Sequence, residues 1–309
     1  MVAVAVIGLG TMGQGIARVT LDYGFDTNLY DVDSTRARAA SDRILLNLNL
    51  KNSSGSAEHA QAQIAPTVLT YDSIEAAVAG ANVVIECVPE HAPLKAQVLK
   101  AIVGAAPIDS LIASNTSTMS IGTLAVAGDC EGRLVGMHFF NPATKMRLVE
   151  IIRAPGVSEA LITRAEQFVR SLRKSPITIE DSPGFVTSRL GLVLGNEAMR
   201  MVESGIATVS AIDAAMRLGY NHPMGPLELA DLVGLDARLN NLRSIHEALP
   251  DVRFEPPQIL IDLVEANHLG RKSSQGFYLY DADGHKIAST VSDDDNAFLE
   301  NVRASGMAF

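Results

Sequence analysis

The segment from Val2 to Gly13 restricts the fold of this chain more than any other. A β-branched apolar run, Val2 to Ile7, leads directly into Gly8-Leu9-Gly10-Thr11-Met12-Gly13. Apolar residues then recur three or four positions apart, at Ile16, Val19 and Tyr23, which indicates an amphipathic helix. A strand, a G-x-G-x-x-G turn and a helix in this order are typical of a dinucleotide-binding unit. We therefore predict a nucleotide site at this turn.

The three glycines of the turn each have a separate purpose. Gly8 permits the tight turn, Gly10 lets the backbone approach a pyrophosphate, and Gly13 allows the helix to pack closely on the strand. The helix N-terminus then offers free N–H groups and a positive dipole end to the phosphates. Thr11 and Met12 lie in the same turn, so we predict that all five residues contact the cofactor.

An acidic residue in the expected place identifies the cofactor more closely. A second strand, Thr27 to Tyr30, ends in Asp31, eighteen residues after Gly13. An acid at this distance binds the adenosine ribose hydroxyls. It also repels a 2′-phosphate, and Val32 and Asp33 supply no basic replacement. The sequence therefore predicts NAD rather than NADP.

Strand-like and helix-like segments then alternate along the first part of the chain. Helical patterns over residues 93–103 and 158–172 separate several apolar runs typical of strands, at residues 83–88, 111–113, 134–139, 149–152 and 176–179. Repeated strand–helix units favour an α/β fold with a doubly wound, mainly parallel sheet of the Rossmann type. Between Arg43 and Lys95 the pattern is less regular, and Ser53-Ser54-Gly55-Ser56 predicts a turn between two helical arms.

After Asp181 and Ser182 the strand pattern stops and longer helical stretches follow. Glycines and prolines separate them, and they are expected at residues 185–203, 210–218, 227–248 and 257–266. We predict a nucleotide-binding domain over residues 1–182 and a smaller all-α domain over residues 183–309.

The composition argues against several classes of function. The net charge is −10 and no basic patch is evident, so nucleic acid is not an expected partner. The sequence contains no uncharged apolar run of about 18 residues, so no membrane span is expected. The start of the sequence lacks a basic leader, and Cys87 and Cys130 are too few and too far apart for a disulfide framework or a metal site. We therefore expect a cytoplasmic protein without a bound metal.

Polar residues gather where the predicted strands end. Glu90, the run Ser114-Asn115-Thr116-Ser117 and His138 all occupy such positions, and ligands bind beyond the carboxyl ends of strands in these sheets. Glu150 follows in the next apolar run. A histidine oriented by a carboxylate is suited to moving a proton at neutral pH. Taken alone, the same residues also fit helix caps and a core histidine whose ring nitrogens are satisfied.

Separated motifs along almost the whole chain share the order and spacing of one family. They are Gly8 to Gly13, Ser114 to Ser117, His138 to Pro142, Leu148 to Glu150, Pro183 to Phe185, Pro223 to Leu229, and Gly270 through Tyr278. In these motifs the chain resembles the L-3-hydroxyacyl-CoA dehydrogenases. The resemblance implies fatty acid metabolism and NAD-dependent, reversible oxidation of an L-3-hydroxyacyl thioester, in particular a short-chain 3-hydroxyacyl-CoA. It also implies a homodimer paired through the helical domain.

The resemblance further implies a role for individual residues. His138 would be the general base that removes the hydroxyl proton, and Glu150 would hold the imidazole and stabilise its charged form. Beside the substrate it places Ser117, Asn141 and Ser188. Beside the cofactor it places Glu90, Lys95, Asn115 and Lys272 in addition to Asp31 and the residues of the glycine turn.

Two departures from the family pattern leave the substrate open. Ser188 stands where many members carry an asparagine next to the substrate, and serine cannot form the paired contacts of an amide. Between Arg43 and Lys95, where the family places coenzyme A contacts, Lys51 is the only fixed positive charge. A group on an acyl carrier protein, a sugar acid or a carnitine-like molecule is therefore an alternative substrate.

Two other classes of protein are weaker alternatives. The β-hydroxyacid dehydrogenases use a similar glycine turn, but their small-residue signature of the Asp-Ala-Pro-Val-Ser-Gly-Gly type does not occur here. A nucleotide-binding protein without catalysis would not need the set formed by Ser117, His138, Asn141 and Glu150.

Overall fold

The computed structural model describes residues 2–53 and 66–289, apart from the side chains of residues 47–53 and 288–289. The turn predicted at Ser53 to Ser56 and the side chain of Lys51 therefore fall outside the described part, save for the backbone of Ser53. The chain divides into two compact units, Met1–Phe185 and Val186–Phe309. Among the described residues, no helix combines the length and the apolar character needed to cross a membrane.

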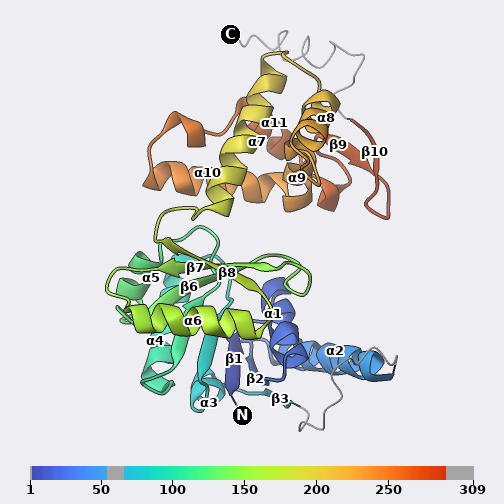
Figure 1. The fold of residues 1–309 in the computed structure, drawn as a ribbon. Coiled ribbons are helices and arrows are strands. Elements are labelled where there is room, and N and C mark those ends of the chain that lie inside the picture. The colour runs from blue at the N-terminus through green and yellow to red at the C-terminus, as the bar shows by residue number, and fades with distance from the viewer. Residues whose placement is uncertain (1, 54–65, 290–309) are drawn as a thin grey trace. The chain divides into compact units, whose positions relative to one another are not determined.

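The first unit is built on one sheet, in which eight described strands have the order β3-β2-β1-β4-β5-β6-β7-β8 (Figure 1). Strands β1 to β6 are parallel to one another, β7 is antiparallel to β6, and β8 is parallel to β7. This arrangement confirms the predicted doubly wound, mainly parallel fold. The strands are β1 Ala3–Ile7, β2 Asp26–Tyr30, β3 Val68–Thr70, β4 Val83–Glu86, β5 Leu111–Ser114, β6 Leu134–Phe139, β7 Leu148–Arg153 and β8 Ser175–Glu180.

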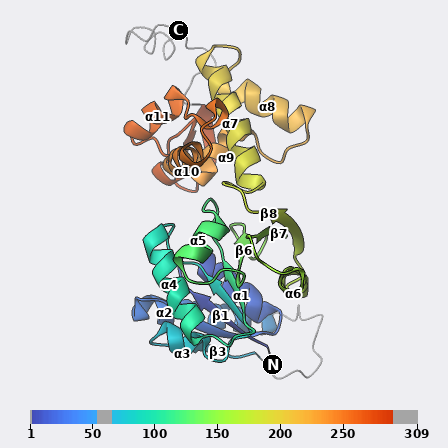
Figure 2. The same ribbon diagram turned by 90° about the vertical axis from the view of Figure 1, so that its left-hand side faces the viewer.

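Helices cover both faces of this sheet, which explains why the central strands are mainly apolar. Figure 2 shows α1 and α6 on one face and α4 and α5 on the other. Strands covered on both sides need continuous apolar runs, and β4, β5 and β6 are buried along their whole length. The helices are α1 Thr11–Asp22, α2 Ser34–Ser53, α3 Ile74–Val78, α4 Ala92–Ala105, α5 Ile121–Ala127 and α6 Glu159–Ser171.

The reversal of direction between β6 and β7 brings two distant polar residues face to face. The antiparallel register pairs His138 directly with Glu150. Directly opposite residues of an antiparallel pair have side chains on the same face, with Cβ atoms about 5 Å apart. The segment of residues 140–147 closes the hairpin. The carboxyl end of β6 therefore meets the amino end of β7 at the edge where ligands of such sheets bind.

The second unit is mainly helical, as predicted, but it differs from the expectation in two details. Its helices are α7 Thr187–Glu203, α8 Val209–Gly219, α9 Pro226–Val233, α10 Leu235–Ala248 and α11 Gln258–Glu265, with short 3-10 turns η1 Val252–Phe254 and η2 Arg271–Ser273. The single helix predicted over residues 227–248 is wrong, since Gly234 interrupts it with a φ of 101°. Such a backbone angle favours glycine and ends a right-handed helix.

The prediction of an all-α domain is also wrong in one place, because the unit contains an antiparallel hairpin. Strands β9 Tyr278–Tyr280 and β10 Lys286–Ser289 form it. The sequence signal is short: Tyr278 and Tyr280 are buried while Leu279 is exposed. Three alternating residues are too few to distinguish a strand from a loop.

Two buried aspartates attach this hairpin to the helices. Asp213 accepts hydrogen bonds from the N–H groups of Leu227 and Glu228 and from the Tyr278 hydroxyl, at 2.8–2.9 Å. Asp231 accepts them from the N–H groups of Phe277 and Tyr278 and from the Tyr280 hydroxyl, each at 2.9 Å. Burial raises the pKa of both carboxyls, that of Asp231 to about 6.

Glycines allow the backbone to approach these carboxylates. A Cβ on Gly225 would lie 2.2 Å from Cγ of Asp213, and one on Gly276 would lie 2.1 Å from Oδ1 of Asp231. Neither distance is sterically possible without a shift of the backbone. The motifs around Pro223 to Leu229 and Gly270 to Tyr278 thus have a structural cause within this unit.

Candidate active site

The glycine turn is closed where it packs and open where a phosphate would approach. Gly8 has a φ of +95°, and a Cβ there would lie 2.8 Å from the backbone of Cys87 and Val88. A Cβ on Gly13 would lie 1.9 Å from the Gly8 carbonyl oxygen, whereas one on Gly10 would meet no atom within 4 Å. Gly10 also precedes α1 without a side-chain cap. These features fit the pyrophosphate of a dinucleotide at the helix N-terminus.

Asp31 holds the glycine turn in place. Its Oδ2 accepts a hydrogen bond from the Leu9 N–H at 2.7 Å, and its Oδ1 accepts one from the Asp33 N–H at 3.0 Å. The Arg36 guanidinium lies 3.4 Å from Oδ1. Arg36 was not among the residues predicted from the sequence. Its position in the first turn of α2, shortly after Asp31, was the one sign that it could lie near this carboxylate. Arg36 therefore adds a positive charge next to the Asp31 carboxylate and does not take its place.

A second carboxylate, Glu86, organises the loop after β4. Its oxygens accept hydrogen bonds from the Val88 N–H and the Ser114 hydroxyl, both at 2.6 Å, and from Lys95 Nζ at 2.9 and 3.1 Å. Glu86 is fully buried and Lys95 is 1% exposed. Sequence reasoning assigned no role to Glu86, although an acid at the end of an apolar strand was a visible signal.

Three predicted residues of the first unit, Glu90, Lys95 and Ser117, are connected with one another, and a fourth, Asn115, ties the neighbouring strand ends together. Glu90 accepts a hydrogen bond from the Ser117 N–H at 2.8 Å, and its carboxylate lies 3.6 Å from Lys95 Nζ. Asn115 accepts a hydrogen bond from the Phe139 N–H at 2.8 Å, which ties the end of β5 to the end of β6. The loops after β4 and β5 and strand β6 are thus joined at one edge of the sheet.

His138 and Glu150 form a buried hydrogen-bonded pair at this edge. Nδ1 of His138 lies 2.7 Å from Oε2 of Glu150, and the two residues are 7% and 0% exposed. The rings of Phe140 and Phe185 pack against the imidazole, with centroids 4.5 and 5.9 Å away. Among the described residues, Glu150 is the one hydrogen-bond partner of the imidazole. Asn141, three positions after His138, is exposed.

The remaining two predicted residues belong to the second unit. Ser188 lies in the first turn of α7. Lys272 lies in η2, and its Nζ is within 2.6 Å of the Asp236 carboxylate at the start of α10. The predicted contact of Ser188 with the substrate and that of Lys272 with the cofactor therefore stay predictions.

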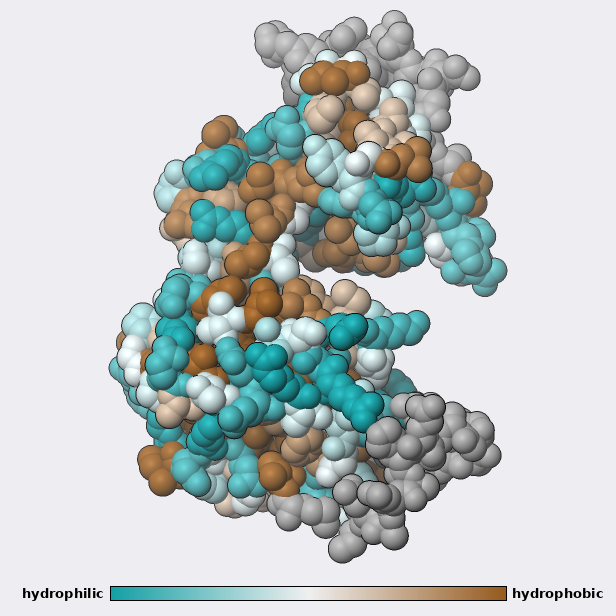
Figure 3. Space-filling view, in the orientation of Figure 1, coloured by the Kyte–Doolittle hydropathy of each residue, from teal (hydrophilic) through white to brown (hydrophobic). Residues whose placement is uncertain are grey.

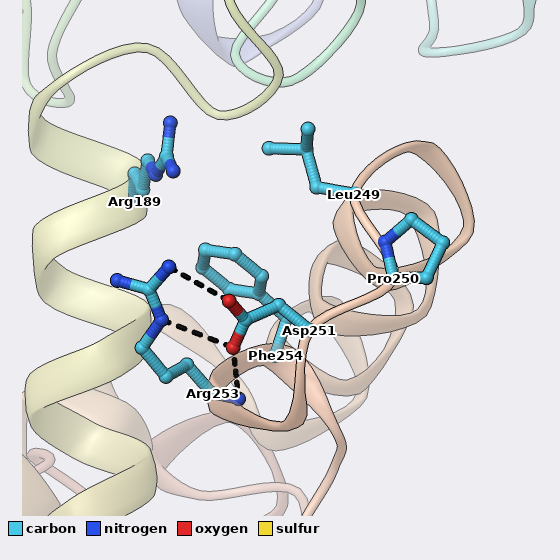
Figure 4. Close-up of a pocket in the computed structure, with 6 residues that line it drawn as sticks. All are labelled: Arg189, Leu249, Pro250, Asp251, Arg253 and Phe254. Atoms are coloured by element: carbon cyan, nitrogen blue, oxygen red, sulfur yellow. Dashed lines mark hydrogen bonds and ion pairs between the residues drawn. The ribbon is translucent and has the colours of Figure 1, made fainter.

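A pocket of ≈ 250 Å³ in the second unit contains none of the predicted residues (Figure 4). The Asp251 carboxylate there pairs with Arg253, and the guanidinium groups of Arg189 and Arg253 lie 5.5 and 5.8 Å from the Phe254 ring centre. Leu249 and Pro250 complete the lining. The one carboxylate in its lining is already paired with Arg253, and no histidine or predicted site residue lines it, so it does not compete with the sheet edge as the candidate active site.

Comparison with known proteins agrees with this geometry. Residues 3–182 match the NAD-binding domain of 3-hydroxyacyl-CoA dehydrogenase, and residues 184–280 match its C-terminal domain. The chain is 38% identical over 278 residues to a 3-hydroxybutyryl-CoA dehydrogenase of Bradyrhizobium diazoefficiens, with 90% of this chain and 94% of the relative covered.

Solved structures show the same fold. The (S)-3-hydroxybutyryl-CoA dehydrogenase of Ralstonia eutropha superposes with a TM-score of 0.84 at 35% identity, covering 90% of this chain and 99% of that one. A 5-formyl-3-hydroxy-2-methylpyridine 4-carboxylic acid 5-dehydrogenase, described as an NAD+-dependent dismutase, has a TM-score of 0.73 at 29% identity, with 99% and 96% covered. Sequence, fold and glycine turn together show that the chain belongs to the 3-hydroxyacyl-CoA dehydrogenase family and is an NAD-dependent oxidoreductase acting on a CH–OH group.

Proposed function

We propose that this protein reversibly oxidises a short-chain L-3-hydroxyacyl-CoA to the 3-oxoacyl-CoA, with His138 as the general base. The observation that carries this proposal is the buried hydrogen bond of 2.7 Å between His138 Nδ1 and Glu150 Oε2. It fixes the ring, so that Nε2 is the nitrogen that exchanges a proton with the substrate. Bound NAD supplies the acceptor for the hydride that leaves the carbinol carbon.

The residues of this chain handle the proton and the substrate oxygen. In the oxidative direction the hydroxyl O–H bond breaks and its proton moves to Nε2 of His138. The resulting imidazolium is stabilised by the Glu150 carboxylate, the orienting function of the acid in hydrolytic triads. Ser117 and Asn141 hold the oxygen on which the carbonyl forms. In the reductive direction the same imidazolium returns the proton.

The test is reduction of acetoacetyl-CoA by NADH in the His138→Ala variant. Removal of the general acid–base is expected to lower kcat by roughly 10²–10⁴-fold. The dissociation constant of NADH should change little, which shows that the variant is folded. His285→Ala is the matched control, since His285 lies in the exposed hairpin turn. Undiminished turnover in His138→Ala would overturn the assignment.

A second candidate keeps this chemistry and changes the substrate. Lys51 is the only lysine or arginine between Arg43 and Lys95, and the dehydrogenase named above, whose name is that of a pyridine carboxylic acid, has the same fold. A panel at fixed NAD concentration would compare a 3-hydroxyacyl-CoA with its carrier-protein thioester, a sugar acid and carnitine. A value of kcat/KM that is higher for a free acid than for the thioesters would favour this second candidate.

We also propose a homodimer formed through the helical unit. Large apolar side chains are exposed on this unit at Leu190, Ile206, Leu218, Tyr220, Leu229, Leu232 and Val233. Brown, hydrophobic residues recur over it in Figure 3. Exposed apolar side chains that gather in one patch are typical of an interaction site. Light scattering should give the mass of two chains, and a monomeric mass at micromolar concentration would contradict the proposal.

A further inference from the structure

We propose that Glu86 is a positioning residue of this enzyme. It holds Lys95 and, through Lys95, sets the place of Glu90 beside the cofactor and of Ser117 beside the substrate. The inference rests on the proposed function, because that function gives Glu90 and Ser117 their roles. Glu86 itself is fully buried behind these residues.

Both oxygens of the Glu86 carboxylate accept hydrogen bonds from groups that lie next to the candidate site. Oε1 accepts hydrogen bonds from the Val88 N–H at 2.6 Å and from Lys95 Nζ at 2.9 Å. Oε2 accepts them from the Ser114 hydroxyl at 2.6 Å and from Lys95 Nζ at 3.1 Å. A charge buried in this way is tolerated only when it is paired and hydrogen-bonded. Glu86 therefore joins β4, β5 and α4 where the sheet ends.

Lys95 lies behind Glu90. An ammonium group has three donors, and those of Lys95 are taken up by the two oxygens of Glu86 and by the Val88 carbonyl at 3.0 Å. The Lys95 side chain is 1% exposed, whereas that of Glu90, 3.6 Å away, is 41% exposed. A ligand thus meets Glu90 first, at a place determined by the buried ion pair.

Glu90 in turn connects the Glu86–Lys95 pair to the loop that carries Ser117. Glu90 Oε2 accepts a hydrogen bond from the Thr116 hydroxyl at 3.0 Å, and Oε1 accepts one from the Ser117 N–H at 2.8 Å. A shift of Glu90 therefore moves the loop that carries Ser117. Removing one partner of a buried ion pair leaves an uncompensated charge. Loss of the Glu86 charge should therefore displace Lys95, then Glu90, and with it the contacts to both ligands.

Two serines at opposite ends of β5 provide a matched pair of variants for the test. The Ser114 hydroxyl, at the carboxyl end of β5, donates to Glu86 at 2.6 Å. The Ser110 hydroxyl, just before the amino end of β5, donates to the Ala81 carbonyl at 2.7 Å. Both side chains are buried. Ser110→Ala loses this one buried hydrogen bond, and Ser114→Ala loses the short one to Glu86 together with a long one of 3.4 Å that Oγ accepts from the Thr116 N–H. The two variants should therefore lower the thermal midpoint by comparable amounts.

Binding of NADH, followed by its fluorescence, separates positioning from stability. The NADH dissociation constant should rise about threefold or more in Ser114→Ala and roughly tenfold or more in Glu86→Gln, but not in Ser110→Ala. Glu86→Asp, which keeps the charge on a shorter side chain, should recover part of the affinity lost in Glu86→Gln. The KM for acetoacetyl-CoA should rise in the same order, since Ser117 moves with Glu90.

Two outcomes would overturn the proposal. One is an unchanged NADH dissociation constant in Ser114→Ala and Glu86→Gln alongside a lowered thermal midpoint, since this is the result of a merely structural residue. The other is an equal loss of affinity in Ser110→Ala. Should Glu86→Gln fail to fold, the two serine variants decide between these results. NADH binding requires no substrate, so it tests Glu86 even if the His138 assignment fails.

Discussion

The two units both bury carboxylates, but they give them different partners. In the first unit, Glu86 lies within hydrogen-bond distance of Lys95, and Glu150 within that of His138. In the second unit, Asp213 and Asp231 are as deeply buried, yet they accept hydrogen bonds from backbone N–H groups and tyrosine hydroxyls. The first kind of partner can carry a positive charge. The second kind stays neutral, because burial raises the pKa of Tyr278 and Tyr280.

This difference separates two uses of a buried acid. A carboxylate beside a group that gains a proton can stabilise charge that develops during a reaction. A carboxylate surrounded by fixed dipoles instead determines the conformation of the backbone that supplies them. We infer that Glu150 acts in the chemistry, while Asp213 and Asp231 hold the hairpin and the start of α9 in place.

The largest expected effect distinguishes the two uses directly. Glu150→Gln keeps the shape of the side chain but removes the charge that stabilises the His138 imidazolium. We expect kcat for acetoacetyl-CoA reduction to fall by roughly 10²–10⁴-fold. Asp213→Asn, the matched change in the second unit, should retain kcat and lower the free energy of unfolding by about 1–3 kcal/mol. Steady-state kinetics and denaturant titration on both variants would check this, and the reverse pattern would remove the distinction.

A glycine in each unit allows the same comparison for the backbone. Gly13→Ala places a Cβ 1.9 Å from the Gly8 carbonyl, and Gly225→Ala places one 2.2 Å from Cγ of Asp213. Overpacking of this kind destabilises each variant by roughly 1–3 kcal/mol or more. Only Gly13→Ala should also weaken NADH binding, which fluorescence titration measures. Equal NADH affinity in the two variants would contradict the assignment of the glycine turn.

The pH dependence of stability should reveal Asp231. Its pKa is raised by burial from 3.8 to about 6 in the folded chain. The folded state then binds the proton more tightly than the unfolded state, so the protonated carboxyl contributes stability at low pH. This contribution, about 3 kcal/mol for a shift of some two units, is lost as the pH rises from 4 to above 6. Asp231→Asn cannot titrate, so its unfolding free energy relative to the wild type should improve over that range. A constant difference would argue against the raised pKa.

The smallest expected effect concerns Ser188. Ser188→Asn restores the amide that many family members carry and adds a second hydrogen-bonding group. For a hydroxyacyl-CoA substrate we expect KM to fall by roughly 2–10-fold with little change in kcat, as one hydrogen bond contributes about 1 kcal/mol. A rise in KM would indicate that the serine belongs to a different substrate.

Features of the fold that depend on neighbouring residues were easier to predict from the sequence than features that depend on contacts between distant segments. The strand, glycine turn and helix around Gly8 were predictable because their pattern depends on neighbouring residues. The break at Gly234 and the hairpin at Tyr278 were missed because their signals are weak: an isolated glycine is tolerated within a helix, and three alternating residues do not distinguish a strand from a loop. The sequence predicted Lys95 as a cofactor contact, but it could not show that Lys95 lies buried behind Glu90.

For the candidate site, the residue types were predictable and their geometry was not. His138 and Glu150 were chosen as a pair from their chemistry and from the family resemblance. Their direct opposition depends on β7 running antiparallel to β6, whereas the prediction was only of a mainly parallel sheet. The buried aspartates of the second unit gave no signal, because a single acid in an amphipathic helix is usually exposed.

The hairpin of β6 and β7 makes the pair that we propose for proton transfer a local unit of the chain. Its register places His138 directly opposite Glu150, on the strands that flank the segment of residues 140–147. That segment carries Asn141, which we propose to contact the substrate. Substitutions that keep the length of this segment can therefore alter which alcohol is accepted without separating the imidazole from its carboxylate. In such an arrangement, substrate choice and proton transfer can evolve independently, and loop grafting between relatives is the engineering route it offers.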